Sequence, residues 1–220
     1  MKNKEENRGQ KRAFTLAEVL ITLVIIGVIA ALTVPTLIQN TQKQEYVSAL
    51  KKAYSTLSQA TLKILEEDEI KANNLNRVKE QYKKHLNVAK DCGRDTQCGF
   101  AGDTKDLQKN IVSNAQELAN GESWYASTTR LALADGTVLL FHWRSGWHCS
   151  TDSKSYSCYH ILVDLNGPKA PNIVGRDIFG FDLYYGKIIP IGSVSSNPCK
   201  MPKGDFGCTA KVLAEGAMNY

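Results

Sequence analysis

A long run of uncharged, mostly apolar residues constrains this chain more than any other feature. It extends from Val19 to Ile38, twenty residues without a charged side chain. An α-helix of that length spans about 30 Å, which matches the hydrocarbon thickness of a bilayer. One carboxylate, that of Glu18, lies immediately before the run. Because a charge in hydrocarbon is costly, a carboxylate at this place predicts a function and a charged partner.

Two simpler interpretations account for only part of this pattern. The apolar core of a secretory signal peptide is about 7–15 residues long and ends at a small-residue cleavage site. Here the run is longer, and residues 35–40 lead into a helical pattern instead. A plain membrane anchor explains the length and, through the positive-inside rule, the flanking Lys11 and Arg12. A plain membrane anchor gives Glu18 no role.

The segment from Ala13 to Leu20 resembles the processing site of type IV prepilins and of type II secretion pseudopilins. In that family a short basic leader ends in a small residue, cleavage precedes Phe or Met, and the fifth mature residue is Glu. The matching positions are Phe14, Thr15, Leu16 and Glu18. Ala13 stands where the family usually has Gly. The resemblance implies cleavage before Phe14 by a membrane prepilin peptidase and methylation of the new Phe14 nitrogen.

This processing would supply the partner that Glu18 needs. When apolar helices stack with an axial offset, the ammonium of one Phe14 can meet Glu18 of a neighbouring copy. Desolvation offsets much of the attraction, so the pair is expected to set register more than to add stability. Gly27 and Pro35 lie where pilins tend to carry Gly and Pro. Both weaken a helix, so the segment between them is expected to extend or unwind during assembly.

Charge and length suggest an anchored subunit with one head domain. The formal net charge is +5, and the leader alone contributes +3 of it. The dispersed remainder does not support nucleic-acid binding. We predict a leader over residues 1–13, a membrane and filament-core helix segment over 14–38, its amphipathic continuation over 39–66, and a globular head over 67–220. The head is long enough for a core of its own.

Periodicity predicts an α+β head of the pilin type. Apolar residues recur at helical spacing from Tyr46 to Leu65, so the first helix continues, and a short second helix is expected around 75–86. The lysines of the continuation, at positions 43, 51, 52 and 63, are expected to face water or neighbouring subunits. Strands are expected at 129–134, 137–143, 159–164, 181–185 and 187–191, with a hairpin turn at Asp135-Gly136. A long helix before an antiparallel sheet gives the α+β class.

All six cysteines lie beyond the apolar run. An even number on the outer side of a membrane predicts disulfides. Local clustering favours the pairs Cys92–Cys98, Cys149–Cys158 and Cys199–Cys208. A zinc site is the alternative, with ligands from His148, Cys149, Cys158 and His160, although compact zinc modules usually have more closely spaced cysteine pairs.

A second polar cluster lies within residues 163–179. Four oxygen-bearing side chains could surround a calcium ion there, in loose similarity to calcium loops of some pseudopilin heads: Asp164, Asn166, Asn172 and Asp177. The alternative is a turn rich in Asp and Asn, in which Gly167 and Gly175 adopt positive backbone angles. No other cofactor is expected.

The expected function is structural and not enzymatic. Ser145, His148 and Asp152 are close in sequence, but a catalytic triad is recognised by geometry and not by proximity along the chain. The resemblance implies an inner-membrane, single-pass subunit with a cytoplasmic N-terminus and a periplasmic or extracellular head. Its partners would be copies of itself, other pilin-like subunits, prepilin peptidase and an inner-membrane assembly platform. A type II secretion pseudopilus is expected, a type IV pilus for adhesion, motility or DNA uptake is the alternative, and an anchored binding domain or enzyme is a further one.

Overall fold

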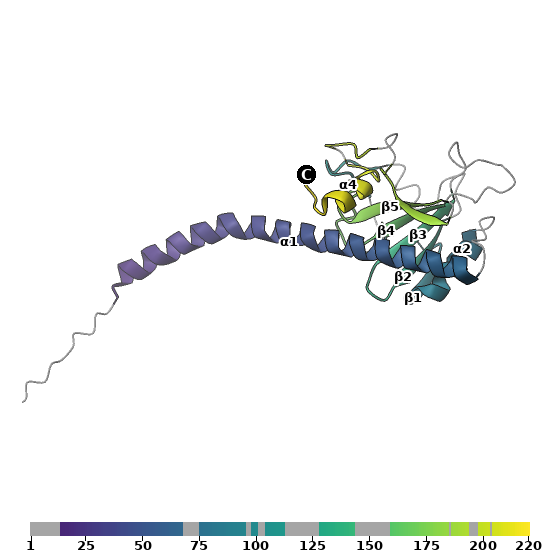
Figure 1. Ribbon diagram of the computed structural model, residues 1–220. Coiled ribbons are helices and arrows are strands. Elements are labelled where there is room, and N and C mark those ends of the chain that lie inside the picture. The colour runs from purple at the N-terminus through teal and green to yellow at the C-terminus, as the bar shows by residue number, and fades with distance from the viewer. Residues whose placement is uncertain are drawn as a thin grey trace, which may run out of the picture. The chain divides into compact units, whose positions relative to one another are not determined.

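The computed structural model describes residues 14–67, 75–95, 98–100, 104–112, 128–143, 159–184, 186–193, 198–202 and 204–220. Its helices are α1 (Leu16–Glu67), α2 (Leu75–His85) and α4 (Cys208–Glu215), and its strands are β1 (Val88–Gly93), β2 (Thr128–Leu133), β3 (Val138–Trp143), β4 (Tyr159–Asp164), β5 (Ile178–Tyr184) and β6 (Lys187–Pro190) (Figure 1). Two compact units divide the chain between Gln42 and Lys43. Helix α1 therefore begins in one unit and ends in the other.

The first half of α1 has no core of its own. Every side chain from Phe14 to Gln42 is exposed in the isolated chain. The helix is long and apolar enough to cross a membrane by length and composition. An apolar helix that buries none of its surface within its own chain requires lipid or other helices around it.

The head is built on one antiparallel sheet, in which the strands lie in the order β1-β2-β3-β4-β5-β6. The second half of α1 buries one face on it, through Val47, Leu50, Ala53, Leu57, Ala60 and Ile64. These residues recur at spacings of three and four, which places them on one stripe of the helix. The rings of Tyr54 and Phe181 stack with centroids 5.7 Å apart and join helix to sheet. The prediction of a pilin-like α+β fold is confirmed.

The opposite face of the sheet is buried as well. It carries a smaller apolar cluster of Phe100, Val138, Leu140, Leu162, Val174 and Ile178. Since successive strand residues point to opposite faces, Leu139 contributes to the α1 side and Leu140 to this one. Burial on both faces explains why β3 has a continuous apolar run instead of an alternating pattern.

Two elements were not predicted from the sequence. Strand β1, with the sequence Val-Ala-Lys-Asp-Cys-Gly, contains one β-branched residue and is an edge strand whose pairing with β2 shifts register twice. Helix α4 ends at Gly216, which adopts a φ of 64° and donates its N–H to the carbonyl of Val212. The expectation that strands begin only near residue 129 was therefore wrong, because pairing with β2 overrides the weak strand propensity of β1.

Lys43 in α1 also differs from the expectation. Lys43 Nζ donates to the carbonyl of Met218 at 3.2 Å and to that of Tyr220, and Lys52 Nζ lies 2.7 Å from Asp135 Oδ2 in the β2–β3 turn. Lys43 is half-buried against the head of its own chain, so the prediction that it faces water or a neighbour was wrong. Lys52 remains 64% exposed while it pairs with Asp135, which agrees with the prediction that it faces water. Their long side chains reach polar groups beside the helix while the stems cover its flank.

Two of the three expected disulfides are present. They join Cys92 to Cys98 and Cys199 to Cys208. Cys149 and Cys158 lie outside the described residues, and so do Ser145, His148 and Asp152. Among the cysteines that the structure describes none is free.

Candidate assembly site at the start of helix α1

Thr15 and Glu18 form a closed set of hydrogen bonds at the beginning of α1. Glu18 Oε2 accepts the Thr15 backbone N–H and the Thr15 hydroxyl, each at 2.8 Å. In return, Thr15 Oγ1 accepts the Glu18 backbone N–H at 3.2 Å. This is the capping box of a helix whose N-cap is Thr15 and whose third residue is Glu18. The carboxylate satisfies the Thr15 N–H and the Thr15 hydroxyl satisfies the Glu18 N–H, two groups that have no helical partner at the start of a helix.

The capping box gives Glu18 a partner within its own chain. Among the described residues, all three bonds use Oε2 or the Glu18 N–H, and Oε1 accepts none. Phe14 precedes the cap directly and is 86% exposed. A carboxylate held at one oxygen and open at the other, beside an exposed residue at the expected processing point, is suited to receive a cation from a second chain.

Comparison with known families identifies this region. Residues 8–34 match the family model of the prokaryotic N-terminal methylation motif. The chain carries the prepilin-type methylation motif of type IV pilins and pseudopilins. This motif implies processing by prepilin peptidase and assembly with pilin-like subunits, and the apolar helix is consistent with anchoring in the inner membrane. No curated protein and no solved structure matches the chain significantly.

Gly27 and Pro35 both lie within the exposed half of α1, which is helical throughout in the isolated chain. A Cβ added at Gly27 would meet no atom within 4 Å, so packing inside the chain does not require glycine there. Pro35 removes one helical N–H donor. Nearby, the hydroxyl of Thr33 donates to the carbonyl of Ile29 at 2.9 Å. The unwinding of this segment during assembly stays a prediction.

The expected calcium loop between β4 and β5 uses its polar side chains to hold its own backbone. The carboxylate of Asp177 accepts the N–H groups of Asn172 at 2.8 Å and of Ile173 at 2.6 Å. Asp164 Oδ2 accepts the N–H of Phe100 at 2.8 Å. Burial raises the pKa of Asp164 to about 7 and also raises the pKa of Asp177, while these backbone hydrogen bonds oppose the shift.

The backbone of this loop matches the alternative to a calcium loop, which was a turn rich in Asp and Asn. Gly167 and Gly175 have φ angles of 65° and 86°, and Asn172 has 49°. A Cβ at Gly167 would lie 2.7 Å from the carbonyl oxygen of Gly136, so this position requires glycine. Asn166 Oδ1 is buried and accepts no hydrogen bond from the described residues, which would suit a cation. Calcium binding by Asp164, Asn166, Asn172 and Asp177 stays a prediction.

One polar row was missed by sequence reasoning. The strand register places His142, His160 and Asp182 directly opposite one another on β3, β4 and β5. The two imidazole rings stack with centroids 6.0 Å apart, and His160 Nδ1 lies 2.5 Å from Asp182 Oδ1. Only the register could have revealed this row, because its members are far apart in the sequence. His160 was one ligand of the zinc alternative, whose other three ligands lie outside the described residues.

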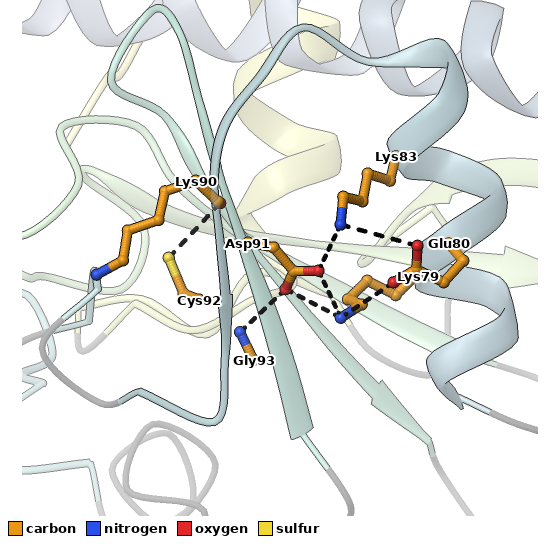
Figure 2. A network of polar contacts seen from close by, with 7 residues as sticks. All are labelled: Lys79, Glu80, Lys83, Lys90, Asp91, Cys92 and Gly93. Atoms are coloured by element: carbon orange, nitrogen blue, oxygen red, sulfur yellow. Dashed lines mark hydrogen bonds and ion pairs between the residues drawn. The ribbon is translucent and has the colours of Figure 1, made fainter.

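A second missed cluster joins α2 to the edge strand β1 (Figure 2). Asp91 accepts hydrogen bonds from Lys79 Nζ at 2.8 and 2.9 Å, from Lys83 Nζ at 2.9 Å and from the Gly93 N–H at 3.1 Å. Partial burial opposes ionisation, but these bonds prevail and lower the pKa of Asp91 to about 2. Lys79 is buried, and its ammonium also lies 3.3 Å from Oε1 of the exposed Glu80. We name Lys79, Lys83 and Asp91 the edge clamp.

Proposed function

We propose that this chain is a pseudopilin, a subunit of a type II secretion pseudopilus, and that it polymerises through the first half of α1. The observation that supports this most is the capping box at Glu18, at the start of a helix whose first half, to Gln42, has every side chain exposed. Cleavage before Phe14 produces an ammonium group four residues from Glu18. In the filament, that ammonium pairs with Glu18 of an adjacent copy.

Helix bundling supplies the driving force of this assembly, and the charge pair supplies its register. Leaving lipid for a bundle of like helices exchanges one apolar contact for another, so side-chain packing and buried polar pairs decide the geometry. The Thr15 hydroxyl keeps Glu18 partly satisfied until a neighbour arrives. An inner-membrane assembly platform, acting on the head from the membrane side, would extract each subunit in turn.

Substitution of Glu18 tests this role. We expect Glu18→Ala to leave cleavage and membrane insertion intact and to abolish incorporation into filaments, because the neighbouring ammonium then has no counter-ion. Incorporation is measured by shearing filaments from cells and by cross-linking between copies. Glu45→Ala is the matched control, since Glu45 is also an exposed glutamate of α1 but lies beyond the apolar run. Normal filaments in the Glu18 variant would contradict the proposal.

Thr15 provides a finer test of the same mechanism. Thr15→Ser keeps the hydroxyl that Glu18 uses and should assemble normally. Thr15→Val removes it at similar volume, costs about 1 kcal/mol of helix capping, and should slow assembly.

Secretion and pilus functions are separated by the phenotype of a strain that lacks this chain. Loss of the release of exported proteins, with motility and adhesion intact, is the result expected for a pseudopilin. Loss of motility, adhesion or DNA uptake with normal secretion would instead assign the chain to a type IV pilus.

A further inference from the structure

The head unit starts only a short distance along the chain from the apolar run. Four residues, 39–42, lie between Ile38, the last of that run, and Lys43, where the compact head unit starts, so the two are five residue steps apart. Five steps span no more than about 18 Å in a fully extended chain and about 7.5 Å in a helix. The polar headgroup layer extends roughly 5–8 Å beyond the hydrocarbon. Chain length therefore keeps Lys43 within reach of the headgroup layer if the apolar run spans the bilayer.

Hydrogen bonds identify which parts of the head lie at the end that contains Lys43. Lys43 Nζ donates to the carbonyls of Met218 and Tyr220, which fixes the last residues beside the first turn of α1 in the head. The Tyr220 hydroxyl donates to the carbonyl of Gly175. Asn166 Nδ2 lies 3.5 Å from the Tyr46 hydroxyl and donates to the carbonyl of Ala170 at 3.2 Å. The β4–β5 loop is thus held at this end at two points.

This end carries cationic and aromatic side chains and an exposed carboxylate. That carboxylate belongs to Glu215, which accepts a hydrogen bond from Asn219 Nδ2 at 3.0 Å, and burial together with the Glu215 charge raises the pKa of Tyr220. Lys169 is exposed at the loop tip between Pro168 and Ala170, and Arg176 is half-buried. Both acids of the same loop, Asp164 and Asp177, are buried, so they offer no carboxylate at the surface. Glu45, the nearest exposed acid along α1, is separated from Tyr46 by about 100° around the helix. Basic and tyrosine side chains together are typical of protein surfaces at the membrane–water interface.

We propose that the patch formed by Lys43, Tyr46, Lys169, Arg176 and Tyr220 binds anionic phospholipid headgroups on the outer surface of the membrane that anchors α1. The cations attract lipid phosphates, and the tyrosines lie at the headgroup level. Binding holds the head against the bilayer before assembly. Extraction of the subunit then breaks these contacts, so the lipid charge sets how readily a subunit leaves the membrane. The inference depends on membrane anchoring and not on the type of filament.

The test uses the full chain in nanodiscs of phosphatidylcholine alone or mixed with phosphatidylglycerol. Backbone hydrogen exchange of the peptide covering residues 166–176 is measured by mass spectrometry at low and high salt. Each cation near an anionic surface shifts the docking equilibrium by about fivefold. We expect several-fold slower exchange in the anionic nanodiscs, lost at high salt and lost in the double variant Lys169→Glu/Arg176→Glu.

The control makes the same change of charge at the far end of the head. Lys84 is exposed on α2, and Lys187 follows Gly186, which is packed against Leu65 near the end of α1. Lys84→Glu/Lys187→Glu should keep the protection. Glu18→Ala, which is expected to block assembly, should keep it too, so the two proposals fail separately. Equal exchange in both lipids, or equal loss of protection in both double variants, would overturn the inference.

Discussion

At the scale of single residues, burial decides what a polar side chain does. Glu18 lies in the exposed first half of α1, and its Oε2 accepts hydrogen bonds from the N–H and the hydroxyl of Thr15. Its other oxygen accepts none from the described residues, and we propose that it receives a cation from another chain. Asp164 has no exposed surface and accepts the N–H of Phe100, two residues after Cys98 of the Cys92–Cys98 disulfide. Its carboxyl group stabilises the fold of its own chain. Both residues stand out in the sequence as acids in unusual positions. Only their burial in the structure shows that Asp164 stabilises its own chain, whereas Glu18 is exposed and could act between chains.

The raised pKa of Asp164 predicts a specific pH dependence of stability. In the unfolded chain this carboxyl titrates near 3.9, and in the folded head near 7. The folded state therefore binds more protons between about pH 4 and 7, so the contribution of Asp164 falls as pH rises through that window. Asp164→Asn, which still accepts the Phe100 N–H, should flatten this slope.

The measurement is the urea midpoint of the detergent-solubilised chain at pH 5 and pH 7.5, for wild type and variant. Equal pH slopes in the two proteins would contradict a raised pKa. Added calcium provides a second comparison at pH 7.5. A midpoint that rises in wild type and not in the variant would support the predicted calcium site, because a ligand that binds only the folded state must stabilise it.

At the scale of elements, both edges of the sheet are closed to further strands. Strand β1 has two register shifts and is held by the edge clamp and the Cys92–Cys98 disulfide. Strand β6 has four residues and ends at Pro190. Bulges, proline and lysine at an edge discourage pairing with another chain. The helix α1, and not a strand, is therefore the element suited to polymerisation.

The edge clamp makes a prediction of its own. Asp91→Ala leaves the buried Lys79 without its carboxylate, so we expect a loss of about 1–3 kcal/mol in the free energy of unfolding. Urea unfolding measures this loss, and hydrogen exchange should localise it to β1 and α2. Lys90→Ala serves as the control, because the ion pair of Lys90 with Asp95 is exposed. Equal stability of the Asp91 variant and wild type would show that the clamp contributes nothing.

The elements that could be predicted from the sequence are those with a strong local pattern. The Asp135-Gly136 turn was correct because Gly136 has a φ of 91° and Asp135 Oδ1 accepts the N–H of Thr137, both local effects. Strand β1 and the row of His142, His160 and Asp182 depend on which strands pair, and no local pattern encodes that. The edge clamp was missed for the same reason, since Lys79 and Asp91 belong to different elements. Helix α4 did carry a local signal, the glycine after its last turn.

At the scale of the whole molecule, the two units differ in whether they bury apolar side chains within the chain. The head from Lys43 to Tyr220 has its own core on both faces of the sheet. The preceding unit buries no side chain from Phe14 to Gln42 and requires surroundings outside the chain. In the proposed function, a membrane surrounds this unit before assembly and a bundle of like helices surrounds it afterwards. The motif at residues 8–34 implies processing, and we propose that cleavage before Phe14 links the two states.

Processing is therefore the central claim, and intact-mass and N-terminal analysis of the protein from its native membrane tests it most directly. The account predicts a chain that begins at N-methylated Phe14. Under non-reducing conditions its mass should be short by six hydrogens, which includes the predicted Cys149–Cys158 pair. A chain that retains residues 1–13 in a cell with active prepilin peptidase would contradict the account and leave a membrane-anchored domain without an assembly role.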